Sequence, residues 1–137
     1  MKMRSHCPVN YALEHFGDKW SLLIIRDLMF KNKRHYNEFF EAEEKVSTSV
    51  LGSRLRSLEE AGIISKGEDG VKKSRIRYSL TRKGINLLPL MTELILWSND
   101  FDVETATDEG FIKNVQEGKA DYLANLEKKL IQEHLKE

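Results

Sequence analysis

The segment from Val46 to Gly62 constrains the fold more than any other part of the chain. Ser47 is a residue type that begins helices, because its side-chain oxygen accepts a hydrogen bond from a backbone amide of the first turn. Leucines then recur at helical spacing on one stripe, and Ala61-Gly62 is a stop signal. The stripe consists of Leu51, Leu55 and Leu58, and the opposite face carries Ser49, Ser53, Arg56 and Glu60. The pattern predicts a capped helix over residues 48–61 with one buried face.

A predicted β-hairpin follows this helix. Residues 63–66 form a short strand, Glu68-Asp69-Gly70 is a turn sequence, and residues 75–80 alternate polar and apolar side chains as a half-buried strand does. The alternation predicts that Ile76, Tyr78 and Leu80 face the core. The cations expected at the tip and outward face of the hairpin are Lys72, Lys73, Arg75 and Arg77.

Helices are predicted on both sides of this unit. A first short helix starts at Cys7-Pro8-Val9 and stops at Gly17, and Asp18 caps a second helix. Further helices are expected over residues 36–43, 82–100 and 111–137, the last as one or two amphipathic helices. The predicted fold class is mainly α with a small β-hairpin wing. It corresponds to a winged helix-turn-helix domain over residues 1–102 with a C-terminal helical extension over residues 103–137.

The chain has no net charge, but its charges are unevenly distributed. Residues 54–83 contain nine lysines and arginines against four acidic residues, whereas residues 84–137 contain five against eleven. A local basic surface attracts phosphate groups even where the total charge is neutral. No apolar run is long enough to cross a bilayer, and the amino terminus lacks the apolar core of a secretory signal. We therefore expect a cytoplasmic protein without membrane contact.

The order helix, short helix, turn, capped helix, hairpin and long helix predicts binding to double-stranded DNA. The second helix of a helix-turn-helix unit enters the major groove, because a helix with its side chains matches the groove width. The hairpin cations would then contact the backbone or the adjacent minor groove. The side chains that the helix would contribute are Thr48, Ser49, Ser53, Arg54 and Arg56. Singly, such residues are more often caps or solvated charges, but their convergence on one basic surface favours the DNA interpretation.

Several segments in the same order resemble the HxlR-type regulators, which are relatives of the MarR group. The matching segments are CPV at 7–9, GDKWSLLIIRDL at 17–28, HYNEF at 35–39, VSTSVLGSRLRSLEEAGII at 46–64 and RIRYSLTRKG at 75–84. The resemblance implies a dimeric repressor or activator, with a groove-reading helix at 48–61 and a wing at 66–77. It also implies dimer contacts from the first helix and from the long helix after the wing. We expect these at Tyr11, Leu87, Leu90, Met91, Leu94 and Trp97, in a homodimer on a near-palindromic operator.

The single cysteine is a candidate redox sensor. Several HxlR-type regulators carry a cysteine near the amino terminus that senses electrophiles or oxidants, and Cys7 matches that position. A thiol at a helix start can have a lowered pKa, because the helix dipole favours the thiolate. The alternative is a small apolar residue that fills a gap at the dimer edge. Without a second cysteine, any disulfide has to join two subunits or trap a small thiol.

An enzyme, a protein-interaction module and a ligand-responsive regulator are the competing classes. The four histidines have no metal-binding spacing, and no nucleophile or phosphate-binding motif is present, so we expect no enzyme, metal or cofactor. Winged helices used only for protein contacts usually lack basic residues on the reading helix and wing, whereas this chain has them. A regulator without redox sensing, which binds a small apolar effector between the long helix and the core, stays compatible with the sequence.

Overall fold

The predicted helix after Ser47 is α3 (Thr48–Glu60) in the computed structural model, which describes residues 2–72 and 74–135. The Ser47 Oγ accepts a hydrogen bond from the Val50 amide at 3.3 Å, and the three leucines of the stripe are buried. The helix ends at Ala61, and Gly62 has a left-handed backbone with a φ of 74°, which glycine adopts without steric cost. The predicted cap, stripe and stop are confirmed.

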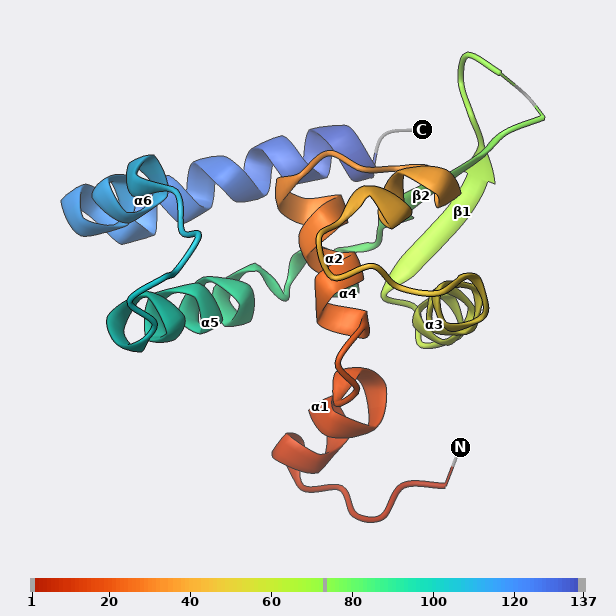
Figure 1. Cartoon of the computed structure of the whole chain (residues 1–137), viewed down its shortest axis with the longest axis horizontal. Helices are drawn as coiled ribbons and strands as arrows, with labels where there is room; N and C mark the ends of the chain where they lie inside the picture. Colours follow the sequence, from red (N-terminus) through yellow and green to blue (C-terminus); the bar gives the residue numbers. More distant parts are fainter. Residues whose placement is uncertain (1, 73, 136–137) are drawn as a thin grey trace.

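The elements around α3 follow the predicted order (Figure 1). The described elements are α1 (Pro8–Phe16), α2 (Ser21–Phe30), the 3₁₀ helix η1 (Tyr36–Glu41), α3, β1 (Ile64–Glu68), β2 (Ile76–Leu80), α4 (Arg82–Ile85), α5 (Leu88–Phe101) and α6 (Glu109–His134). Figure 1 shows α2 at the centre, α3 and the hairpin on one side of it, and α5 with the start of α6 on the other. The fold class is mainly α with a hairpin wing, as predicted.

The hairpin joins the core at one end and leaves it at the other. β1 pairs antiparallel with β2, in a register that runs from Ile64 opposite Leu80 to Glu68 opposite Ile76. Tyr78 and Leu80 are buried as predicted, but Ile76 is 48% exposed. The prediction for Ile76 is wrong because it lies at the end of β2 farthest from the buried Leu80, where its partner Glu68 is also exposed. The predicted turn at residues 68–70 is a longer loop, since Glu68 still pairs within the sheet.

The helix predicted over residues 82–100 is two helices. α4 ends at its cap Asn86 after one turn, and α5 begins at Leu88 with Pro89 in its first turn. Proline has no amide proton and its ring collides with the preceding turn of a continuous helix, so it fits only near a helix start. The prediction of one continuous helix is therefore wrong.

The C-terminal region forms one helix with a kink. Gly118 lies inside α6 with a non-helical φ of −179° and ψ of 74°. Leu130, in the second half of α6, is 1% exposed and belongs to the main core, and the end of α6 lies beside β2 (Figure 1). The division into residues 1–102 and 103–137 stays a prediction. Among the described helices, none combines the length and the apolar character that spanning a membrane requires.

Candidate nucleic-acid interface

The outer face of α3 presents short polar side chains and one arginine. Thr48, Ser49 and Arg56 are exposed, and Ser53 is half-buried. The first turn of α3 contains no acidic residue, so the positive end of its dipole is not neutralised there. This end of the helix favours an anion.

Arg54, unlike the exposed Arg56, is held by contacts within the protein. Its Nη1 lies 3.7 Å from Asp18 Oδ1, and its Nη2 donates to Ser53 Oγ at 3.2 Å. Burial acts to raise the pKa of Asp18, but hydrogen bonds from Ser21 and Trp20, together with Arg54, hold it below the ordinary value. The structure therefore directs Arg54 toward the turn before α2.

Arg56 lies across a gap that Gly52 creates in the outer face of α3. A Cβ added at Gly52 would lie 3.5 Å from Arg56 Nη1 and 3.9 Å from the Tyr36 hydroxyl. That hydroxyl donates to the Thr48 carbonyl at 3.2 Å. Tyr36 thus borders the same surface. It was not among the predicted DNA-binding residues, because the sequence around it indicated only a short helix packed on the core.

The wing cations occupy different environments. Lys72 is exposed, and Arg75 is exposed with its Nη1 3.7 Å from Asp69 Oδ2. Arg77 is half-buried, close enough to Arg34 for the two positive charges to oppose each other. Lys73 lies outside the described residues. The DNA roles of all four stay predictions.

A histidine bridge ties the wing to the helix-turn-helix unit. His35 Nδ1 lies 2.9 Å from Glu38 Oε1, and His35 Nε2 lies 2.9 Å from Asp69 Oδ2, at the base of the wing loop. The Val71 amide donates to Asp69 at 2.9 Å, and this bond with that from His35 lowers the pKa of Asp69. Asp69 therefore stays charged and holds both ends of the wing loop, which the turn prediction did not anticipate.

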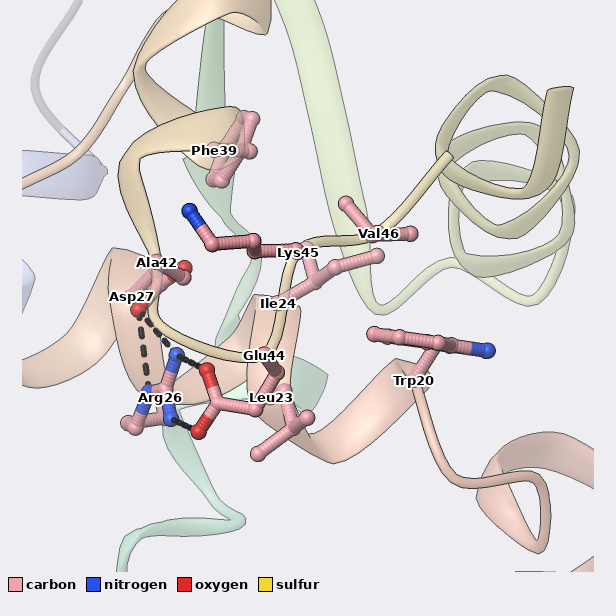
Figure 2. A pocket seen from close by; sticks show the side chains of 10 residues that line it. All are labelled: Trp20, Leu23, Ile24, Arg26, Asp27, Phe39, Ala42, Glu44, Lys45 and Val46. Carbon is pink, nitrogen blue, oxygen red and sulfur yellow. Dashed lines mark hydrogen bonds and ion pairs between the residues drawn. The ribbon is translucent and has the colours of Figure 1, made fainter. Parts of the chain in front are cut away.

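A second ion-pair cluster fixes the loop that leads into α3. Figure 2 shows Arg26 between the carboxylates of Asp27 and Glu44, with hydrogen bonds of 2.9 Å to Asp27 and 2.8 and 3.1 Å to Glu44. The pocket beside it has a volume of about 10 Å³, which holds at most about one water molecule. The ion pairs thus join α2 to the loop before α3, and the pocket beside them is too small for a ligand.

A larger cleft lies between α2, α5 and α6, with a volume of about 1090 Å³. Phe111 forms edge-to-face contacts with Phe30 at 6.2 Å and Tyr122 at 5.7 Å between ring centroids, and all three rings line the cleft. Its charged lining residues are of both signs, four cations and five carboxylates: Arg26, Lys31, Lys33, Lys129, Asp27, Glu41, Glu43, Glu44 and Asp108. The cleft offers an aromatic wall with charged side chains of both signs near it.

Cys7 is exposed at the N-cap of α1. The backbone amides of Asn10 and Val9 donate toward its sulfur and lower the pKa of the thiol. Arg4, which the sequence places nearby, instead pairs with Glu14 at 2.8 Å. The lowered pKa of the Cys7 thiol therefore comes from the backbone amides at the start of α1 and not from Arg4. Whether Cys7 senses oxidants stays a prediction.

The residues predicted to form the dimer interface differ in exposure. Trp97 is 66% exposed, Leu90 and Leu94 are also exposed, and Leu87 is half-buried, whereas Met91 is 6% exposed inside the core. Trp97 packs against the exposed Phe101 at 5.6 Å between ring centroids, so the apolar surface of α5 extends beyond the predicted set. On α1, the exposed Tyr11 accepts a hydrogen bond from Lys83 at 3.0 Å. The dimer role of these residues stays a prediction.

Comparisons with known proteins identify the family of this chain and agree with its fold. The profile of the HxlR-like helix-turn-helix family matches residues 15–105. The uncharacterized HTH-type transcriptional regulator sll1512 of Synechocystis is 33% identical over 95 residues, which are 69% of this chain and 70% of that protein.

Two of the similar solved structures are redox or transcriptional regulators. The redox regulator HypR in its oxidized form is 28% identical with a TM-score of 0.61, over 69% of this chain and 96% of HypR. The transcriptional regulator YodB of B. subtilis, in its reduced form, is 27% identical with a TM-score of 0.58, over 74% of this chain and 99% of YodB. YodB has also been solved treated with diamide and bound to quinone.

Proposed function

This chain belongs to the HxlR-like helix-turn-helix family of transcriptional regulators, and from that premise we propose that it binds a near-palindromic operator in double-stranded DNA as a cytoplasmic homodimer. The observation that carries the proposal is the outer face of α3. This face is exposed beside the basic wing, while the inner face is buried through its leucines.

Under this proposal, α3 and the wing contact different parts of the DNA. Helix α3 enters the major groove, where Ser49 and Ser53 contact base edges and Arg56 contacts a phosphate or a guanine. Thr48 and the amide end of the helix face the backbone. The wing cations contact phosphates, which increases affinity on every sequence and carries little sequence preference.

The homodimer supplies the symmetry of the operator. Its proposed interface is the exposed apolar surface of α5 together with α1, which contributes Tyr11. Two copies of α3 then lie about 34–36 Å apart and meet consecutive major grooves.

Salt dependence of binding tests the wing assignment. Each phosphate contact contributes about 0.9 to the slope of log affinity against log salt, so Lys72→Gln with Arg75→Gln should reduce the slope by about 1.8 for each wing. The matched control is Lys113→Gln with Lys119→Gln, which removes two cations from α6. Fluorescence anisotropy with a labelled operator measures both. Equal slopes for the two double variants would reject the wing assignment.

Cys7 is the proposed site of electrophile sensing. Its exposure and lowered pKa support it, as does the existence of a quinone-bound form of the similar regulator YodB. The thiolate sulfur would add to a ring carbon of a quinone, and one quinone oxygen would take up a proton from water. The hydrogen of the attacked carbon would move to the other oxygen as a proton, which gives a hydroquinone thioether. Treatment with benzoquinone should then change the DNA affinity of the wild type but not of Cys7→Ser. Equal responses of the two proteins would exclude Cys7 as the site of electrophile sensing.

A regulator controlled by a small apolar effector is the second candidate, and the cleft between α2, α5 and α6 favours it. Its aromatic wall of Phe30, Phe111 and Tyr122 suits an apolar aromatic effector. The fluorescent probe 8-anilinonaphthalene-1-sulfonate should bind the wild type and bind more weakly to Ser98→Trp, because the new indole takes up part of the space inside the cleft. Equal fluorescence with both proteins would exclude the cleft as the binding site.

A further inference from the structure

The wing strand β2 has a second edge that β1 does not use. β1 pairs with β2 from Ile64 opposite Leu80 to Glu68 opposite Ile76. The amides of Tyr78 and Leu80 point away from β1, since each donates elsewhere: Tyr78 to the Arg34 carbonyl at 2.7 Å and Leu80 to His134 Nδ1 at 2.9 Å. A third strand would normally satisfy such an edge. Here one acceptor is a loop carbonyl and the other is a side chain from the end of α6.

Arg34 connects the same edge to α6. Its Nε donates to the Tyr78 carbonyl at 2.7 Å and its Nη2 donates to Ser79 Oγ at 2.5 Å. Its Nη1 donates to the Glu133 carbonyl at 3.3 Å, in the last turn of α6. The guanidinium therefore spans the gap between β2 and the C-terminal end of α6.

His134 is held in place from both sides. It is 7% exposed, its Nδ1 accepts from the Leu80 amide, and the backbone of Leu28 in α2 is close enough to act on its pKa. Leu130, one turn earlier in α6, is buried in the core and fixes the helix. Burial lowers the pKa of His134 to about 4, and Arg34 and Arg77 act in the same direction, so Nδ1 is an available acceptor at neutral pH.

We propose that His134 is a positioning residue for the wing, because it takes the place of a third strand beside Leu80 and fixes β2 to α6. Its effect on DNA binding rests on the proposed function, whereas its effect on the order of the wing does not. His134 lies beyond residues 15–105, the part that the family profile matches. The C-terminal extension thereby contributes to the orientation of the wing cations relative to α3.

Hydrogen exchange of the full chain without DNA tests the proposal. His134→Leu removes the acceptor, and His134→Asn places an amide oxygen near the position of Nδ1. Exchange in β2 should become about tenfold faster in His134→Leu, return toward the wild-type rate in His134→Asn, and change little in α3. Unchanged exchange in β2, or an equal increase in β2 and α3, would overturn the proposal. Arg34→Lys, which loses the forked contacts, carries the same expectation if His134→Leu does not fold.

A DNA measurement separates this inference from the proposed function. His134→Leu should lower affinity about tenfold and reduce the salt slope, while the order of preference among duplexes stays that of the wild type. If the wild type binds no DNA but the exchange result holds, the proposed function fails and the role of His134 in the wing stands. If the wild type binds DNA and His134→Leu shows wild-type exchange and salt slope, only the role of His134 is overturned.

Discussion

Acidification should destabilise the folded chain through His134. Its pKa in the folded chain is lowered to about 4 from the ordinary value of 6.5, mainly by burial. The unfolded chain therefore takes up the proton first as the pH falls, and stability that is complete above pH 6.5 is lost progressively down to about pH 4. One pKa unit corresponds to about 1.4 kcal/mol, so the whole loss is about 3.4 kcal/mol, of which about 2 kcal/mol is expected by about pH 5.

Urea denaturation at a series of pH values measures this loss. His134→Asn is the control, because it removes the titrating group and keeps an acceptor toward Leu80. Titratable groups other than His134, such as the buried Asp27, change the free energy of unfolding of both proteins. The free energy of unfolding of the wild type should fall by about 2 kcal/mol more than that of the variant between about pH 7.5 and about pH 5. Parallel curves would refute the reasoning, because His134 would then titrate alike in the folded and unfolded chains.

Three substitutions test the packing that supports the interface. Leu55→Ala removes a buried side chain from the inner face of α3 and should lower the free energy of unfolding by about 2–5 kcal/mol in urea. Ser47→Ala removes the cap of α3 and should cost about 1 kcal/mol in thermal denaturation, against less than about 0.5 kcal/mol for the exposed Ser49→Ala. Gly84→Ala places a Cβ against the Ile63 carbonyl oxygen and should cost about 1–3 kcal/mol, so an unchanged Tm would contradict that close contact.

The sequence predicts best what neighbouring residues determine. The cap at Ser47, the leucine stripe and the stop at Gly62 are local signals, and the structure has all three. The alternation that predicts β2 is also local, but it does not tell where the strand leaves the core. That limit explains why Ile76 is exposed while Tyr78 two residues later is buried. The break before α5 had a signal in Pro89, whose effect outweighs the apolar periodicity around it.

Contacts between distant residues were not predictable from periodicity. His35 meets Asp69 across 34 positions, and His134 meets Leu80 across 54. Nothing in the spacing of these residues indicates a partner, since each pairing depends on how whole helices are placed. The same reason applies to Arg54. Its helical phase places it near the outer face of α3, but its guanidinium lies 3.7 Å from Asp18, in the turn before α2. The long-range polar contacts therefore change the predicted set of site residues more than they change the predicted fold.

Selection of bound duplexes from a random pool tests the central claim most directly, namely that a homodimer presents two copies of the outer face of α3 to DNA. We predict enrichment of sequences with two inverted half-sites whose centres lie about one helical turn apart. Substitution of Ser49 or Ser53 should change the preferred half-site and leave the spacing as it is. A pool that shows no enrichment, or an enriched sequence without a repeated half-site, would contradict the claim.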